Sequence, residues 1–303
     1  MQTGVQPLVR ARRTTISLRT LQRLSIAAAA MLLIVVATGA TVRLTASGLG
    51  CLRWPGCEGG VTLPEKGFHS YVEFGNRVVA FITICATLGA WIGALLAPTS
   101  RRLRWLAFGT FFGTMLQAPL GAITIHYDLN PYLVLSHYLL SVVVLTLGVV
   151  LVLEATALLR GHAPPSVPRW VRFGALLVAF SCGVLLVSGT LATAAGPHPG
   201  SVAVRRVWSF EPAVYWHVRA TAVFGISFAI MLAWLAWKRS RHLRTALGVL
   251  AILAVQMTIG EIQYRTKLPW WLVLIHVTTA AAVWTSMSAF AYSLWRPLRR
   301  AST

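Results

Sequence analysis

The segment YVEFGNRVVAF, residues 71–81, is apolar enough to begin a membrane-spanning helix, yet it carries three polar side chains. They are Glu73, Asn76 and Arg77, and spacings of three and four residues place them on one face of a helix. Charged side chains inside a membrane are costly, so they usually face a bundle interior or a cavity and serve a function there. The segment therefore predicts a transmembrane helix with a polar site directed at other helices. An interhelical ion pair between Glu73 and Arg77 without a chemical role is the alternative interpretation.

The composition of the whole chain is typical of an integral membrane protein. Of its 303 residues, 56% are hydrophobic and only 11% are charged, whereas a soluble domain has about 25% charged residues. The net charge is +20, but the basic residues stand in short clusters between apolar runs. Such clusters orient helices in a lipid bilayer, so we predict a membrane environment and no nucleic-acid partner.

Eight apolar runs approach the ~20 residues that a membrane-spanning helix needs. They cover residues 24–46, 70–96, 104–126, 131–154, 169–193, 212–237, 243–262 and 269–295. Basic clusters mark the N-terminal segment and every second connection, which by the positive-inside rule places both termini in the cytoplasm. The first run is of span length and lacks a clear cleavage site, so we expect a retained helix rather than a signal peptide.

The two halves of the chain contain matching segments. The pairs are RLTASG (43–48) with LATAAG (191–196), GAITIHYDLNP (121–131) with GEIQYRTKLP (260–269), and VEFGNRVVAF (72–81) with YWHVRATAVF (215–224). Four spans per repeat is an even number, so both halves have the same orientation, as in a parallel repeat. We predict an all-α integral membrane protein whose eight transmembrane helices form two tandem, parallel, pseudo-symmetric four-helix bundles.

The expected domain boundaries follow from the apolar runs and from the sequence APPSVP at 163–168. They are a cytoplasmic segment 1–23, an N-terminal bundle 24–158, a linker 159–168, a C-terminal bundle 169–296 and a cytoplasmic tail 297–303.

Three histidines, His137, His217 and His276, fall in the outer third of predicted spans. A lone membrane histidine is more often a hydrogen-bond partner between helices than a ligand, but three at repeat-related positions favour metal binding. His217 and His276 belong to the second and fourth spans of the C-terminal bundle, which suits two imidazoles facing each other across a haem iron. Zinc is less favoured because the sequence has no tight Cys/His cluster of ligand spacing.

The N-terminal bundle differs, because the same geometry places His137 opposite Asn76, and asparagine is a poor iron ligand. Val214 stands in the second half where the first half has Glu73. A carboxylate beside a macrocycle can move protons, orient water or stabilise a cation at the ring edge. We therefore expect chemistry in the first half and electron relay in the second, where both axial positions are filled.

Cys51 and Cys57 flank the loop CLRWPGC, which the predicted topology places outside the cytoplasm. That compartment permits a disulfide, and a redox-active thiol pair or two structural thiols are the alternatives. In the later outer loop, His198 reads as a loop residue that can lie near a cofactor edge. Arg205 and Arg206 either pair with carboxylates such as haem propionates or are solvated.

Six segments together resemble the haem A synthase family, most closely its actinobacterial form. They are RLTASGLGCLRWPGC, VEFGNRVVAF, GAITIHYDLNPYLVLSHYLLS, SGTLATAAGPHPG, VYWHVRA and GEIQYRTKLPWWLVLIHV, between about residue 38 and residue 280. The resemblance implies an oxidoreductase that converts the C8 methyl group of haem O to a formyl group by two successive hydroxylations, giving haem A for terminal oxidases. It also implies a substrate-haem site in the N-terminal bundle and a haem b site in the C-terminal bundle.

By this resemblance, each site has matching residues in the sequence. His217 and His276 match the haem b ligands, and His137 matches an axial ligand of the substrate haem. Glu73 matches the catalytic carboxylate, which Arg77 is expected to support. The resemblance further implies that Cys51 and Cys57 form a disulfide.

The sequence departs from the commoner family pattern at two places. Asn76 stands where many members have a histidine, and the later outer loop lacks a second cysteine pair.

The expected partners are haem O and haem A, haem O synthase (the protohaem farnesyltransferase) and an electron acceptor. A homo-oligomer is left open, and the expected location is the bacterial cell membrane. A di-haem b-type membrane electron carrier and a repeat-built transporter are the rival functions.

Overall fold

Eight long helices account for most of the protein, whose computed structural model describes residues 16–51, 56–57, 63–64, 67–201, 204, 206 and 208–299. The helices are α1 (Leu18–Leu44), α2 (Phe68–Leu96), α3 (Arg101–His126), α4 (Pro131–Arg160), α5 (Arg169–Ala195), α6 (Phe210–Trp237), α7 (Leu243–Arg265) and α8 (Trp270–Trp295). By length and composition, all eight can cross a membrane. The prediction of an all-α protein with eight membrane-spanning helices is confirmed.

Most helices are a few residues longer than the predicted apolar runs, and α1 and α4 differ most from them. α1 begins at Leu18 instead of residue 24, and the Ser17 side chain caps it by accepting a hydrogen bond from Thr20 N at 3.0 Å. A serine at this position satisfies a backbone N–H group that has no partner within the helix. α4 continues to Arg160 instead of ending at Glu154, because that carboxylate has partners on α8 and does not need to reach water.

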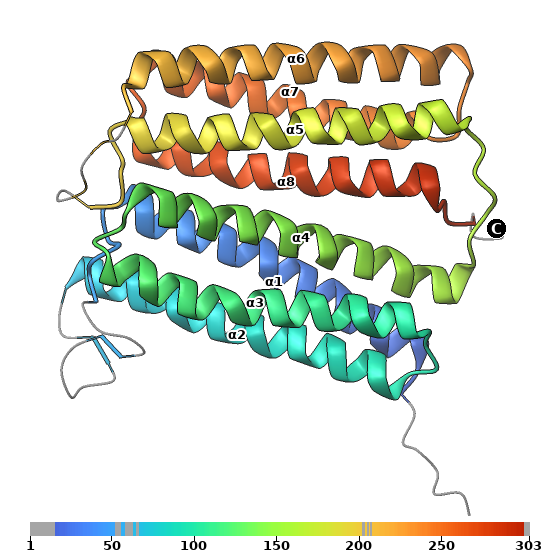
Figure 1. Ribbon diagram of the computed structural model, residues 1–303, viewed down its shortest axis with the longest axis horizontal. Coiled ribbons are helices and arrows are strands. Elements are labelled where there is room, and N and C mark those ends of the chain that lie inside the picture. The colour runs from blue at the N-terminus through green and yellow to red at the C-terminus, as the bar shows by residue number, and fades with distance from the viewer. Residues whose placement is uncertain are drawn as a thin grey trace, which may run out of the picture.

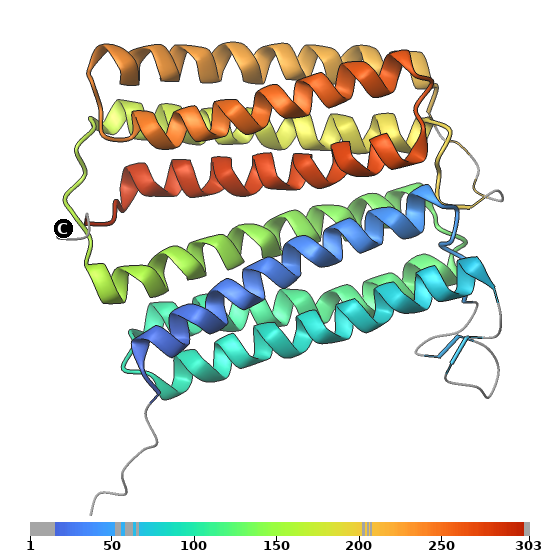
Figure 2. The same cartoon turned by 180° about the vertical axis from the view of Figure 1, so that it is seen from behind.

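Within each half, neighbouring helices contact one another and the last helix returns to the first. α1 packs against α2 and α4 while α3 packs against α2 and α4, and the same contacts recur among α5, α6, α7 and α8 (Figure 1). The halves meet through α1, α4, α5 and α8, and the reverse view shows the same separation (Figure 2). The domain boundaries and the pseudo-symmetry axis stay predictions.

The turns from α3 to α4 and from α7 to α8 have the same backbone conformation. Asp128 and Leu129 have φ values of 50° and 58°, and Lys267 and Leu268 have φ values of 63° and 58°. In each turn the leucine N–H donates to the carbonyl five residues earlier, at 2.9 and 2.8 Å. Positive φ is uncommon for leucine, so the matching pairs indicate that one turn geometry sets both α4 and α8.

The buried apolar side chains of both halves gather away from the loop that joins α1 to α2. We call the end of the molecule with this loop the disulfide end. In the first half the core includes Leu21, Leu103 and Leu151, and in the second half it includes Phe224 and Phe290. Most of these residues lie in the parts of their helices farther from the disulfide end, so the core secures each bundle mainly there.

Polar contacts join the two halves at the end opposite the disulfide end. The Glu154 carboxylate on α4 accepts a hydrogen bond from the Tyr292 hydroxyl on α8 at 2.5 Å, and it pairs with Arg296 at 3.1 Å and His162 at 3.3 Å. Nearer the middle, the Trp284 indole N–H donates to the Thr146 hydroxyl at 2.9 Å. These contacts fix α8 against α4. Because α4 carries His137 and α8 carries His276, they also fix the distance between the two predicted sites.

Candidate functional site

His217 on α6 and His276 on α8 face each other in the second half. Their ring centroids lie 6.5 Å apart, and the ring planes are inclined by 79°. An imidazole nitrogen binds a first-row metal at ~2 Å, so two rings that share one metal have centroids roughly 6 Å apart. The structure therefore brings the two predicted ligands together at a suitable spacing.

The hydrogen bonds of the two imidazoles differ. His217 Nδ1 lies 3.0 Å from the Ser188 hydroxyl on α5, an arrangement that leaves Nε2 for a metal. His276 Nε2 lies 3.1 Å from the Gln256 amide nitrogen on α7. In the described part of the chain, the buried atoms His276 Nδ1 and Gln256 Oε1 have no hydrogen-bond partner.

The two unpaired atoms are complementary, because a protonated Nδ1 is a donor and Oε1 is an acceptor. Leaving a buried polar group unsatisfied costs about 1–3 kcal/mol. Rotation of the His276 ring would let Nδ1 donate to Gln256 Oε1 and would free Nε2 to bind a metal opposite His217. After that rotation, Nε2 of both histidines would be available to one metal.

A glycine on the preceding helix lies against each predicted ligand position. The pairs are Gly39 with Asn76, Gly121 with His137, Gly189 with His217 and Gly260 with His276. A Cβ atom at Gly189 would lie 3.0 Å from His217 Cε1, and one at Gly260 would lie 2.9 Å from His276 Cε1. In the first half, a Cβ atom at Gly39 would lie 3.9 Å from Asn76 Oδ1 and one at Gly121 would lie 3.6 Å from His137 Cε1, so the second half is packed more tightly at these positions.

Each position also has a polar partner on the helix that carries the glycine. The Thr38 hydroxyl donates to Asn76 Oδ1 at 2.7 Å, as Ser188 contacts His217 in the other half. The amide group of Gln117 lies 3.1 Å from His137 Nδ1, as that of Gln256 contacts His276.

These partners follow one sequence rule in both halves, which sequence reasoning missed. The hydroxyl residue directly precedes the glycine on α1 and α5, and the glutamine precedes it by four residues on α3 and α7. The arrangement makes Asn76 the counterpart of His217 and His137 the counterpart of His276. The segments QAPLG (117–121) and QMTIG (256–260) contain this pattern. The sequence comparison of the two halves started at Gly121 and Gly260, so it left out the two glutamines.

Glu73 is buried, with 4% of its surface exposed, and both of its carboxylate oxygens have partners. Oε1 lies 2.6 Å from the Arg77 guanidinium, and Oε2 accepts a hydrogen bond from Cys51 N at 2.8 Å. Arg77 also donates to the carbonyl oxygens of Cys51, at 3.1 Å, and of Gly56. The ion pair exists, but it lies within α2 rather than between two helices, and it holds the loop that follows α1.

Cys51 and Cys57 form a disulfide, as the sequence predicted. Both cysteines are buried, and the Ser70 hydroxyl of α2 donates to Gly50 O at 2.8 Å. A Cβ atom at Gly50 would lie 2.4 Å from His69 O, so only glycine allows the loop to approach α2 this closely. Gly50 and Cys51 are therefore held against α2 beside Glu73.

The later outer loop contributes a structural contact. His198 Nε2 lies 2.8 Å from Leu268 O, which ties this loop to the turn between α7 and α8. Arg206 is exposed, and Arg205 lies outside the described residues.

No group of three or more His, Cys, Asp or Glu side chains in the described ranges is arranged to hold a metal ion. Two imidazoles alone do not complete the usual four-ligand shell of a structural protein metal site. A pair of facing imidazoles suits a metal whose other positions are filled by a macrocycle, as in haem proteins with two axial side chains.

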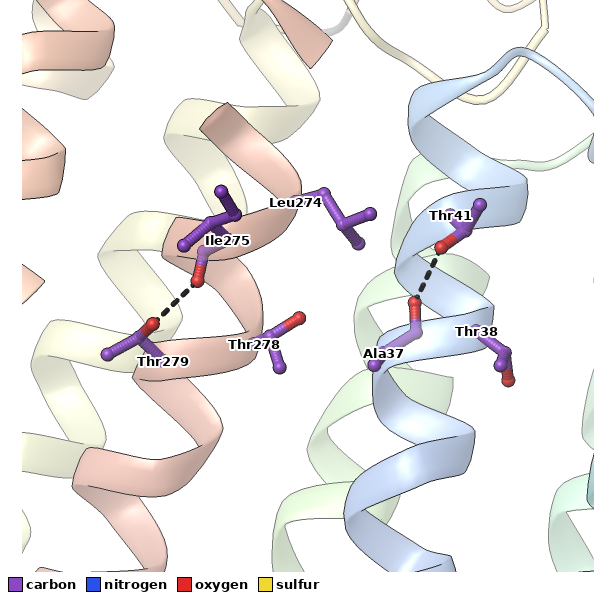
Figure 3. A pocket seen from close by; sticks show the side chains of 7 residues that line it. All are labelled: Ala37, Thr38, Thr41, Leu274, Ile275, Thr278 and Thr279. Carbon is purple, nitrogen blue, oxygen red and sulfur yellow. Dashed lines mark hydrogen bonds between the residues drawn. The ribbon is translucent and has the colours of Figure 1, made fainter. Parts of the chain in front are cut away.

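A cavity of about 350 Å³ lies between α1 and α8, near Asn76 in the first half and His276 in the second. It is lined by Ala37, Thr38, Thr41, Leu274, Ile275, Thr278 and Thr279. Leu274 and Thr278 point from α8 toward α1 (Figure 3). Thr38 bonds to Asn76, and Ile275 directly precedes His276, so the cavity lies between the two halves at the level of their ligands.

The sequence matches a family model described as cytochrome oxidase assembly protein, COX15-CtaA, over residues 22–66 and 59–288. Relatives named heme A synthase match as well. The protein from Symbiobacterium thermophilum is 39% identical over 108 residues, which are 35% of either chain. The protein from Bacillus pumilus is 34% identical over 143 residues, 45% of this chain and 46% of the relative.

A longer match is to the heme A synthase of Alkalihalophilus pseudofirmus, which is 26% identical over 241 residues, covering 76% of this chain and 80% of the relative. The shorter matches, to the proteins from Symbiobacterium thermophilum, Bacillus pumilus and Geobacillus kaustophilus, cover between a third and a half of the length of each relative. The likeness to the actinobacterial form of the family stays a prediction.

Proposed function

The chain belongs to the COX15-CtaA family of cytochrome oxidase assembly proteins, whose model matches most of its length, and on that premise we propose that it is a haem A synthase. Its substrate is haem O, and the C8 methyl group becomes the formyl group of haem A. Each of two hydroxylations removes two electrons from the methyl carbon, and the geminal diol then loses one water. The observation that carries this proposal is the shared framework of glycines and polar partners, which presents two histidines in one half but a histidine and an asparagine in the other.

In this proposal the second half holds haem b between His217 and His276. When bound, haem b supplies one-electron transfer. Ser188 orients His217 through Nδ1, and after rotation of the His276 ring Gln256 would bond Nδ1 of that residue, so that Nε2 of both histidines would be left to hold the iron. Partners of this kind typically change metal affinity 10- to 100-fold when they are removed. The unpaired Gln256 Oε1 and His276 Nδ1 support this role, because ring rotation would satisfy both atoms.

The first half holds the substrate in this proposal, with His137 as the ligand of the haem O iron. Gln117 orients His137 as Gln256 orients His276. Asn76 replaces the second imidazole, and its Oδ1 is already occupied by the Thr38 hydroxyl. Its amide N–H groups are therefore left to donate hydrogen bonds toward the substrate, and Asn76 would not act as a strong ligand of the iron.

Glu73 is proposed to act near the reacting methyl group, by orienting water or accepting a proton. It stands on the same face of α2 as Asn76 and Arg77, one turn nearer the disulfide end. Arg77 and Cys51 N stabilise a negatively charged carboxylate at this position. The same contacts hold the disulfide loop, so a catalytic role has to be separated from a structural one by experiment.

The remaining parts of the proposal concern the surroundings of the enzyme. The basic clusters favour cytoplasmic termini in a bacterial cell membrane. The four electrons that leave the methyl group require an acceptor. Haem O is an apolar substrate made by a membrane farnesyltransferase, so direct transfer from that enzyme avoids passage through water. A homo-oligomer is compatible with these features.

The decisive experiment is extraction and chromatography of the haems bound to the purified protein. We expect haem b together with haem O or haem A. Haem b alone would favour a membrane electron carrier, and a protein free of haem would contradict the proposal. The carrier accounts for His217 and His276, but it gives no reason for a buried Glu73 beside Asn76.

A further inference from the structure

Arg43 lies near the disulfide end of α1, where its Cγ would be 3.7 Å from a Cβ atom on Gly200 of the loop between α5 and α6. It follows Gly39 by four residues, and residues with this spacing share one face of a helix. Gly39 faces Asn76, because a Cβ atom on it would lie 3.9 Å from Asn76 Oδ1. At 1.5 Å per residue, Arg43 is ~6 Å nearer the disulfide end than Gly39.

The Arg43 guanidinium has no anionic partner in the described part of the chain. The residue is half-buried and its Nε atom is fully buried without a hydrogen bond. None of the ion pairs between described residues includes Arg43. Glu73 is engaged by Arg77, Asp128 is exposed, and the nearby group that interacts electrostatically with Arg43 is the neutral Tyr138 hydroxyl.

Arg172 provides a comparison, because its Nε atom is also buried without a hydrogen bond. Its guanidinium lies over the Trp295 ring at 4.9 Å, which supplies a cation–π contact. No such ring contact is found for Arg43 among the described residues. The unpaired state of Arg43 is therefore not a general property of the arginines near the helix ends.

The energies favour a missing anion at Arg43. Its place in the last turn of α1 stabilises a cation by only about 0.3–1 kcal/mol through the helix dipole. Burial of an uncompensated charge costs several kcal/mol, and a guanidinium cannot lose its proton to avoid that cost. A carboxylate can pair with it through two parallel hydrogen bonds.

We propose that Arg43 binds a propionate carboxylate of the haem in the first half, an inference that rests on the proposed function. Tyr138, which interacts with Arg43, directly follows the proposed ligand His137. In the second half the residue four positions after Gly189 is Thr193, and its hydroxyl bonds to Gly189 O at 2.8 Å. Among the described residues, the position in the second half that corresponds to Arg43 therefore carries no cation.

The test compares haem O with its dimethyl ester, in which both propionates are uncharged. The protein is prepared in cells that make no haem O, so that haem b fills the second half, and each ligand is titrated spectroscopically. We expect the unmodified protein to bind the free acid roughly tenfold or more tightly than the ester, as suits a hydrogen-bonded charge pair. Arg43→Met should lose this preference, and Arg43→Lys should keep part of it.

Arg172→Met is the matched control, and it should keep the full preference for the free acid. Equal binding of acid and ester by the unmodified protein would overturn the role of Arg43. This comparison uses the unmodified protein alone, so it does not depend on whether a variant folds. Loss of haem b instead of haem O in Arg43→Met would assign the arginine to the second half and overturn the proposal. Failure of the unmodified protein to take up either form of haem O would contradict the proposed function itself.

Discussion

The two halves of the molecule share a framework but present different side chains to it. Both have a hydroxyl residue and a glycine on the first helix, a glutamine and a glycine on the third, and a turn with two positive-φ residues before the fourth. Against this framework, Asn76 replaces His217, and Arg43 replaces Thr193. If both halves bind a haem as proposed, the shared backbone arrangement would define where each haem lies, and Asn76 or His217 would decide whether its iron has one histidine ligand or two.

The disulfide loop adds to the difference. In the first half, Cys51 and Cys57 close a loop that Glu73 and Arg77 bind through its backbone. In the second half, His198 bonds to the turn between α7 and α8 instead. The first half therefore has a buried carboxylate paired with a partly buried guanidinium beside a cross-linked loop, as expected of the half in which chemistry is proposed.

The largest expected effect comes from removing a ligand of one half. His217→Ala or His276→Ala should abolish haem b binding, because a single remaining imidazole cannot clamp the iron from both sides. His137→Ala should instead remove the substrate haem and leave haem b in place. Reduced-minus-oxidised spectra and haem extraction measure both, and an unchanged haem b signal in His276→Ala would break the assignment of the second half.

A large effect on activity is expected from Glu73. Glu73→Ala should lower haem A formation a hundredfold or more, a typical size for loss of a group that handles protons, and haem O should accumulate in the cells. Glu73→Gln keeps an acceptor for Cys51 N but removes the charge, so it should be nearly as impaired.

Titration of free thiols in the same Glu73 variants separates chemistry from structure. An intact disulfide with lost activity supports the catalytic role. Free thiols together with lost haem O would reduce Glu73 to an anchor for the loop. Normal haem A in Glu73→Ala would remove it from the reaction altogether.

Asn76→His should make the first half resemble the second. The new imidazole would face His137 across the substrate iron and convert it to a six-coordinate, low-spin state with two histidine ligands. We expect haem O to be retained and its oxidation to fall by about tenfold, since the open face is lost. Electron paramagnetic resonance of the oxidised protein reports the change, and a spectrum that stays high-spin would show that the two positions are not equivalent.

The smallest effects should come from the glycines, and they should differ between the halves. Gly260→Ala places a methyl group 2.9 Å from His276 Cε1, so the ring must shift and haem b affinity should fall severalfold. Gly39→Ala meets Asn76 Oδ1 at 3.9 Å, an ordinary contact, and should change haem O binding little. Equal losses in both variants would contradict the tighter packing of the second half.

Much of this architecture could be predicted from sequence because its causes are local. Eight spans follow from apolar runs of membrane length, and the three histidines stand at matching places in them. The disulfide between Cys51 and Cys57 also agrees with the prediction. The helix ends were less predictable, as α4 passes through Glu154, whose partner Tyr292 is 138 residues away.

The sequence by itself determined the membrane class, the number of helices and the candidate ligands, since hydropathy and composition do not depend on distant neighbours. Only the tertiary structure decided how those ligands are held. Ser188 meets His217 across 29 residues of chain, and Gln256 meets His276 across 20. The unpaired state of Arg43 is likewise visible only after folding, because whether a charge has a partner depends on which helices pack around it.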